Sequence, residues 1–184
     1  GNCTTGALIS DKGSLDFLCL PNFQSSTTFA KLLDNTIGGH FGIIVDKTYT
    51  ISQTYIKSTT ILKTSFRNNN DAFDVFDYMP RYYLDNGEMY NPPEIIRFFR
   101  LISGSPTFAL DYNPKLSYAK GKTIHEEHLT YIKSMSHSEG YESLYLYSNI
   151  PYSTILNKKQ IQLNSNKYCI INYNQKIITF SLDY

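Results

Sequence analysis

The chain has 184 residues, enough for one domain with a substantial core. Its formal net charge is +1 at pH 7, so it lacks the basic surplus typical of proteins that bind nucleic acid. No apolar run approaches the roughly 20 residues of a membrane-spanning helix, so neither nucleic acid nor a membrane is an expected partner. The compartment stays open, with a cytoplasmic location as the working expectation.

The first twenty residues predict a β-hairpin. Two apolar runs, at residues 5–10 and 15–20, flank a polar turn at residues 11–14. Gly13 lies in that turn, where the backbone needs a positive φ angle that glycine adopts without steric penalty. The second run is followed by a polar loop that consists of Pro21, Asn22, Phe23, Gln24 and Ser25.

A short helix is predicted near residues 25–34. Phe29, Leu32 and Leu33 recur at the i, i+3, i+4 spacing of one helical face. Ser25 or Ser26 can accept a hydrogen bond as the N-cap. No other helix is predicted in this chain.

The rest of the chain reads as short strands. Composition favours this, since the chain has 16 Tyr and 11 Phe, and aromatic residues are enriched in strands. A Tyr-rich loop at residues 82–93 is too polar and too rich in Pro and Gly for regular structure. Strands spaced about 8–12 residues apart predict an all-β fold, an antiparallel two-sheet β-sandwich that forms a single domain over residues 1–184. The predicted strands are residues 40–45, 49–57, 60–66, 73–78, 94–103, 107–112, 122–135, 141–147, 160–163, 168–173 and 176–182.

No pair of catalytic carboxylates is predicted. Asp74 and Asp77 are three positions apart in one strand, and an odd separation sends side chains to opposite faces of a sheet. The same geometry separates Arg97 from Arg100, so at least one of these two guanidinium groups is expected to be buried beside a carboxylate or carbonyl group.

Neither a metal site nor a cofactor is expected. His125 and His128 flank two glutamates, but a strand points the two imidazoles apart, so the cluster is interpreted as a solvated face. The three cysteines, Cys3, Cys19 and Cys169, are scattered and odd in number, which favours free thiols with Cys19 and Cys169 in strands. A Cys3–Cys169 or Cys19–Cys169 bridge remains open.

Aromatic side chains of the Tyr-rich loop are candidates for contact with a ligand or a partner. Tyr82, Tyr83 and Tyr90 offer flat faces on which a sugar can stack. Packing at a sheet margin, with the hydroxyl groups in water, is the simpler interpretation. A third possibility is contact with a neighbouring domain.

Several segments together resemble the bacterial and archaeal glucoamylase-like and trehalase-like enzymes of glycoside hydrolase family fifteen. The hairpin followed by Pro21-Asn22-Phe23-Gln24-Ser25 is similar to the opening of that family, which continues into a Pro-Arg-Phe-Asp-Ser loop. In chain order, three further stretches resemble family motifs, namely residues 64–80 ending in Asp77-Tyr78-Met79-Pro80, residues 97–104, and residues 111–118.

The resemblance implies a β-sandwich of the super-sandwich type that precedes a helical (α/α) barrel, which this chain does not contain. In the family the two catalytic carboxylates of an inverting hydrolase lie in that barrel. The chain is therefore expected to be a non-catalytic fragment of a longer enzyme that acts on an α-glucan or a trehalose-type substrate. Its loop at residues 21–25 is expected at the substrate rim or the interdomain interface.

The chain departs from the family pattern at charged loop positions. Asn22 and Gln24 replace an arginine and an aspartate, and Lys115 and Ser117 replace Arg and Asp in the later motif. These departures affect substrate specificity rather than fold. Two alternative functions stay open, namely a stand-alone carbohydrate-binding module and a purely structural or assembly domain.

Overall fold

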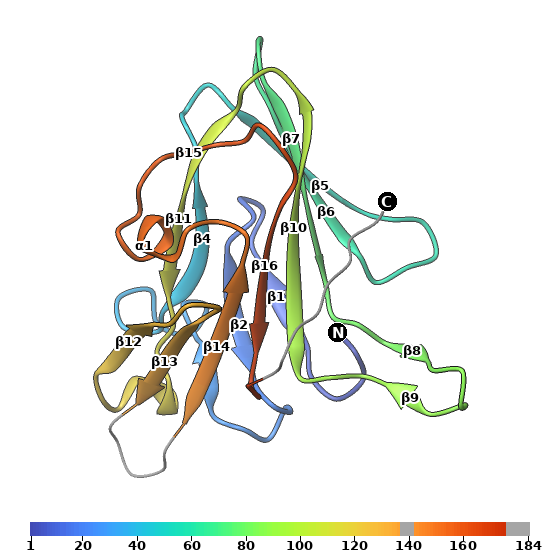
Figure 1. The fold of residues 1–184 in the computed structure, drawn as a ribbon, viewed down its shortest axis with the longest axis vertical. Helices are drawn as coiled ribbons and strands as arrows, with labels where there is room; N and C mark the ends of the chain where they lie inside the picture. The colour runs from blue at the N-terminus through green and yellow to red at the C-terminus, as the bar shows by residue number, and fades with distance from the viewer. Residues whose placement is uncertain (137–141, 176–184) are drawn as a thin grey trace.

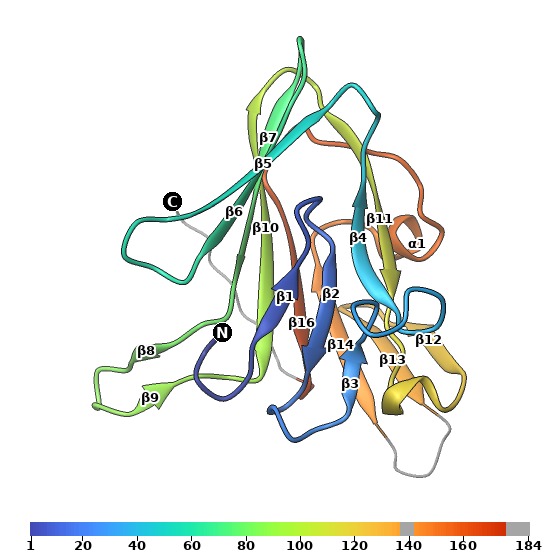
Figure 2. The same ribbon diagram turned by 180° about the vertical axis from the view of Figure 1, so that it is seen from behind.

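The computed structural model describes residues 1–136 and 142–175, and within them it shows two large antiparallel sheets packed face to face. The predicted strand at 176–182 lies outside the described residues. Figures 1 and 2 show the two sheets as the layers of a sandwich. The two-sheet β-sandwich predicted from strand spacing is confirmed.

The larger sheet has eight described strands in the order β12-β13-β14-β16-β10-β7-β6-β5. Its central strand, β10, pairs with β16 on one side and β7 on the other. The strands are β5 (Thr50–Tyr55), β6 (Leu62–Arg67), β7 (Ala72–Tyr78), β10 (Glu94–Ser103), β12 (Thr123–Glu127), β13 (Ile132–Ser136), β14 (Ser143–Ser148) and β16 (Lys167–Asn172).

The smaller sheet follows the order β1-β2-β4-β11-β15, with β3 paired to the side of β2. Its strands are β1 (Ala7–Ile9), β2 (Leu15–Cys19), β3 (Thr27–Phe29), β4 (His40–Ile44), β11 (Thr107–Asn113) and β15 (Ile161–Gln162). The β1–β2 hairpin is confirmed, and Gly13 in its turn has the expected positive φ of 75°.

The helix predicted near residues 25–34 is wrong. Residues 27–29 instead form β3, in which Phe29 pairs with Leu18 of β2. The three residues that predicted the helix do not share a buried face, since Phe29 is fully buried while Leu32 and Leu33 are 61% and 72% exposed. The α-helix in the described residues is α1 (Tyr152–Leu156), which follows Pro151. Hydrogen bonds to the edge of β2 therefore stabilise residues 27–29 as a strand, although their sequence has a weak helical pattern.

The core lies between the sheets and contains a stack of phenylalanine rings. Phe66 and Phe73 of the larger sheet stack with ring centroids 4.5 Å apart. Phe108 of the smaller sheet lies 5.2 Å from Phe73 and 5.1 Å from Phe99, so it joins rings from β7 and β10. All four rings are at most 2% exposed. Aromatic side chains bury a large apolar area each, so this stack contributes to the burial between the layers.

One buried arginine also joins the sheets, through an ion pair within the larger sheet and hydrogen bonds to the smaller one. Arg97 on β10 donates to both carboxylate oxygens of Asp77 on β7, at 2.7 and 3.2 Å. The same guanidinium reaches the smaller sheet, where it donates to the carbonyls of Phe41 (2.6 Å) and Gly13. Arg97 is fully buried, as sequence reasoning expected of at least one of the two arginines. Arg100 lies on the outer face with Asp74.

The Tyr-rich stretch contains a small hairpin that sequence reasoning placed as irregular. Strands β8 (Tyr82–Tyr83) and β9 (Met89–Tyr90) pair with each other and belong to neither large sheet. Both ribbon views show this hairpin standing away from the sandwich beside the N-terminus (Figures 1 and 2). We call residues 81–90 the arm.

Candidate functional site

The N-terminal segment, residues 1–5, is anchored by a buried asparagine. The Asn2 side-chain oxygen accepts the amide hydrogens of Thr4 and Thr5, and its Nδ2 donates to the carbonyl of Pro92 at 2.9 Å. The Thr5 hydroxyl donates to the carbonyl of Cys19 at 2.6 Å. Because Asn2 is fully buried with both ends of its amide bonded, this segment has a defined position at one end of the sandwich.

The predicted loop, residues 21–25, follows β2 at that same end. Asn22 closes it, because its Oδ1 accepts the amide hydrogen of Gln24 at 3.0 Å and the hydroxyl of Ser25 at 3.1 Å. The Phe23 amide donates to the carbonyl of Thr4 at 3.3 Å. Phe23 is 62% exposed. An ordered polar loop thus presents one aromatic ring, which no sequence pattern marks as exposed.

The arm is tied to the same N-terminal segment. Arg81 Nη1 lies 2.9 Å from Cys3 Sγ, and Nδ2 of Asn91 donates to the Thr4 hydroxyl at 3.0 Å. Beyond this base, the ring of Tyr82 lies 4.9 Å from that of Tyr90 between centroids. Tyr82 and Tyr83 are 53% and 71% exposed.

Thr4 therefore connects the two groups that sequence reasoning treated separately. Its carbonyl accepts the amide of Phe23 in the loop, and its hydroxyl accepts a hydrogen bond from Asn91, which directly follows the arm, so the loop and the base of the arm lie next to each other. Asn2 and Thr4 were not predicted, because contacts between residues about 90 positions apart leave no local signal in the sequence.

A third element at this end is the turn η1 (Ser117–Ala119). The amide of Lys115, just before it, donates to the carbonyl of Thr28 in β3 at 3.0 Å. The Ser117 amide donates to Glu142 Oε2 at 2.7 Å, and the other oxygen of that carboxylate accepts the hydroxyl of Ser26. Glu142 thus bridges η1 and the end of the loop. Sequence reasoning missed Glu142, which lies in no recognisable motif.

Asp74 and Asp77, the two aspartates of β7, lie on opposite faces of the larger sheet, as the strand alternation predicts. Burial raises the pKa of the Asp77 carboxyl, and the Arg97 guanidinium opposes that rise. For Asp74, burial also acts to raise the pKa, but hydrogen bonds from Arg67 and Ser65 outweigh it and lower the pKa. Asp74 pairs with Arg67 and Arg100, and Asp77 pairs with Arg97, so the two carboxylates do not form a general acid and base pair.

The histidines of the 125–128 cluster do not converge. His125 Nδ1 lies 2.9 Å from the Ser134 hydroxyl, whereas His128 Nε2 lies 3.5 Å from Glu126. Within residues 1–136 and 142–175, no group of three or more His, Cys, Asp or Glu side chains could hold a metal ion. In the same described part, no helix is long and apolar enough to cross a membrane.

All three cysteines are free thiols, so neither bridge that sequence reasoning left open is formed. Cys19 and Cys169 are buried in β2 and β16, as predicted, and Cys3 is exposed. Burial raises the pKa of both buried thiols, that of Cys169 to about 12.

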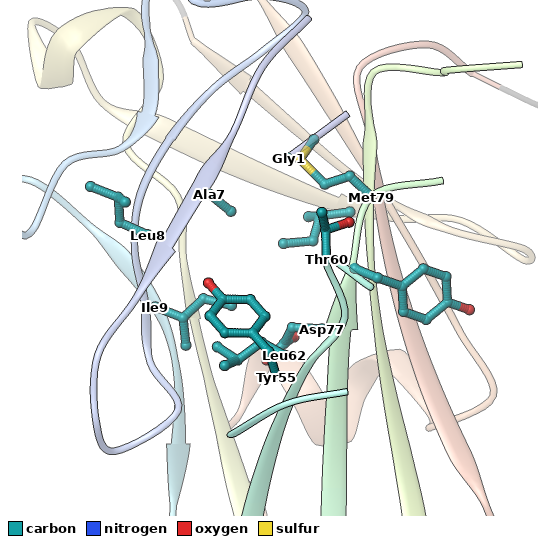
Figure 3. Close-up of a pocket in the computed structure, with 11 residues that line it drawn as sticks. Gly1, Ala7, Leu8, Ile9, Tyr55, Thr60, Leu62, Asp77 and Met79 are labelled. Atoms are coloured by element: carbon teal, nitrogen blue, oxygen red, sulfur yellow. The ribbon is translucent and has the colours of Figure 1, made fainter. Parts of the chain in front are cut away.

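A pocket of about 160 Å³ lies where the edge strand β1 approaches β5, β6 and β7. Figure 3 shows Tyr55, Ile9 and Leu62 around it, with Asp77 among the lining residues. Asp77 is the one carboxylate in this lining, and Arg97 already binds both of its oxygens. The pocket therefore lacks the second carboxylate that glycoside hydrolysis needs.

Comparisons with known proteins point to one family. The family model described as "Trehalase-like, N-terminal" matches residues 1–139. The trehalase of Thermoplasma volcanium is 32% identical over 130 residues, which are 69% of this chain and 20% of that protein. Trehalase 2 of Sulfolobus acidocaldarius is 26% identical over 162 residues, 86% of this chain and 25% of that protein.

The trehalase of Thermoplasma acidophilum is 33% identical over 120 residues, which are 64% of this chain and 20% of that protein. The chain thus spans only about a fifth to a quarter of the length of these curated relatives. No solved structure matches it significantly. These relatives are trehalases. Because the family model matches most of the chain, the chain belongs to the trehalase-like N-terminal domain family.

Proposed function

We propose that this chain is the non-catalytic N-terminal domain of a trehalase-like or glucoamylase-like α-glucoside hydrolase. It packs on and supports a helical (α/α) barrel that follows it in the longer enzyme. That barrel carries the two carboxylates of an inverting reaction on trehalose or an α-glucan. Loop residues Pro21, Asn22, Phe23, Gln24 and Ser25 extend to the rim of the substrate site.

The observation that carries this proposal is the gathering of exposed aromatic rings at one end of the sandwich. Phe23, Tyr82 and Tyr83 are each more than half exposed. Thr4 bonds the Phe23 amide on one side and Asn91, which directly follows the arm, on the other. Exposed apolar groups that gather on one surface are typical of a docking face, and tyrosine is enriched among the residues that dominate binding energy.

The arm adds a separate argument for a covering partner. A two-stranded hairpin is only marginally stable in water by itself. Residues 81–88 are all exposed, and Arg81 and the adjacent Asn91 bond to the N-terminal segment at the base of the arm. A neighbouring domain that covers Tyr82 and Tyr83 would supply the burial that the arm lacks.

The test compares the enzyme that continues beyond residue 184 with the same enzyme lacking residues 1–184, and with this chain alone. We expect the long form to hydrolyse an α-glucoside, the truncated form to inactivate at a lower temperature, and the chain alone to release no glucose from trehalose or maltose. Hydrolysis by the purified chain, or a truncated enzyme of native stability and activity, contradicts the proposal.

A stand-alone carbohydrate-binding module is the second candidate, and the exposed rings of Tyr82 and Tyr83 favour it. This candidate predicts saturable binding of maltooligosaccharides or trehalose to the isolated chain, measurable by calorimetric titration. Loss of that binding in Tyr82→Ala, with retention in the control Tyr55→Ala on β5, would favour it. A purely structural or assembly domain predicts no sugar binding in either protein.

A further inference from the structure

The turn η1 has an unusual backbone. Ser117, Tyr118 and Ala119 all have positive φ angles, of 52°, 55° and 58°. In this left-handed conformation the Cβ of an L-residue crowds the following carbonyl oxygen, so three consecutive non-glycine residues carry strain. Such strain persists only where neighbouring structure over-determines the backbone, and it concentrates at binding sites.

Hydrogen bonds from neighbouring segments hold the backbone of η1 in this conformation. Consecutive amides are bonded to three different elements, with Lys115 bound to the Thr28 carbonyl, Leu116 to the Thr123 hydroxyl, and Ser117 to Glu142. Leu116 is 3% exposed and inserts into the core. These contacts fix the position of the turn and leave its central side chain, Tyr118, facing outward.

Tyr118 is 54% exposed, and the Lys120 ammonium lies 5.8 Å from its ring centroid. Glu142 accepts hydrogen bonds from both Ser117 in the turn and Ser26 at the end of the loop. One carboxylate therefore joins the turn to Ser26, the residue that directly follows the loop at residues 21–25. A strained backbone thus holds an exposed aromatic ring and a hydrogen-bond donor beside the proposed rim.

We infer that Tyr118 contacts the uncharged glucoside substrate at the rim, and that Glu142 is the positioning residue that holds the turn for this contact. The inference rests on the proposed function and adds a second rim element to it. A sugar ring is the fitting occupant, because the aromatic face takes its C–H groups while the Lys120 ammonium donates to its hydroxyl groups.

The first test uses Tyr118→Gly, because glycine accepts the left-handed backbone without strain. We expect the melting temperature of the 184-residue chain to rise by about 2–4 °C. In the longer enzyme, KM for the α-glucoside is expected to rise about two- to tenfold at unchanged kcat, since one ring contact is lost. Tyr118→Phe keeps the ring and should keep the native KM.

Ser58→Gly is the matched control. Ser58 is also left-handed, with φ of 61°, and lies exposed in the turn between β5 and β6, away from the rim. This variant removes the same kind of strain, so it should raise the melting temperature similarly and leave KM unchanged. A similar rise in KM for both variants overturns the inference.

Glu142 is tested by rescue. Glu142→Ala removes the acceptor shared by Ser117 and Ser26 and should raise KM as Tyr118→Gly does, whereas Glu142→Gln keeps an acceptor and should restore most of the native KM. A native KM in Tyr118→Gly overturns the inference while the proposed function stands. If the longer enzyme hydrolyses no α-glucoside, the proposed function fails, and the strain measurement on the chain still reports on η1.

Discussion

The buried ion pair between Arg97 and Asp77 makes a sharp prediction about stability. In Arg97→Met, the apolar part of the side chain keeps its length, so packing changes little. The variant leaves the Asp77 carboxylate buried without its counter-ion and removes the donor to the carbonyls of Phe41 and Gly13. Breaking a buried pair from one side costs about 3–5 kcal/mol of unfolding free energy. For a chain of this size that corresponds to a fall in melting temperature of roughly 6–20 °C.

Arg100→Met is the matched control on the same strand. The Arg100 side chain is 49% exposed, and Asp74 retains its 2.5 Å pair with Arg67 in that variant. An exposed pair contributes about 0–1 kcal/mol, so the control should unfold almost as the native chain does. Urea unfolding followed by circular dichroism measures both. Equal losses in the two variants, or a loss below about 1 kcal/mol in Arg97→Met, would refute the reasoning.

The pH dependence of Arg97→Met gives an internal check on the mechanism. Without the guanidinium, burial alone raises the folded-state pKa of Asp77 above its unfolded value of about 3.9. The variant therefore carries its full penalty only at a pH above that raised pKa, where a bare charge is buried. The penalty shrinks as the pH falls through the raised folded-state pKa, since the carboxyl becomes neutral. Asp77→Leu in the Arg97→Met background should recover part of the loss at pH 7.

Three further predictions concern the core, the thiols and the histidines. Phe108→Ala removes the ring that joins the two sheets and should cost about 3–5 kcal/mol in urea unfolding, so a cost below about 1 kcal/mol would contradict the stacked core. At pH 7.5 a thiol reagent should label Cys3 rapidly and label Cys19 and Cys169 only on unfolding, and fast labelling of all three would contradict their burial. Burial, and to a smaller extent Lys115, lowers the pKa of His125 in the folded chain. Its contribution to the free energy of unfolding is therefore present above the unfolded pKa of about 6.5 and is lost as the pH falls through the lower folded pKa. The urea midpoint should drop between pH 7.5 and pH 5, and His125→Gln should drop less; an equal drop in both would exclude His125 as the cause.

Sequence reasoning worked best where a strand lies in the middle of a sheet. Residues 94–103 were predicted as one long strand, and β10 spans those residues. The alternation of Arg97 and Arg100, and of Asp74 and Asp77, was also right, because a strand has a strict two-residue repeat. The pairing itself, Arg97 with Asp77, depends on the register between β7 and β10 and needed the structure.

Local sequence patterns gave the wrong secondary structure, or none, where pairing with an edge strand or a backbone constraint determines the conformation. Phe29 was placed in a helix by its spacing to Leu32 and Leu33, yet the open edge of β2 draws residues 27–29 into β3. No pattern marks the left-handed backbone of Ser117–Ala119, because none of these residues is a glycine or an asparagine. The three amide hydrogen bonds that fix it end on Thr28, Thr123 and Glu142, all of which lie outside η1.

The amino-acid sequence alone determined the all-β class and most strand positions, because aromatic content, two-residue alternation and turn residues act within a few positions of each other. Only the tertiary structure placed the loop at residues 21–25, the arm and η1 at one end of the sandwich. That placement depends on Asn2, Thr4 and Glu142, whose contacts join segments far apart in the chain. Such contacts form only when both sheets have closed, and for this reason no local pattern predicts them.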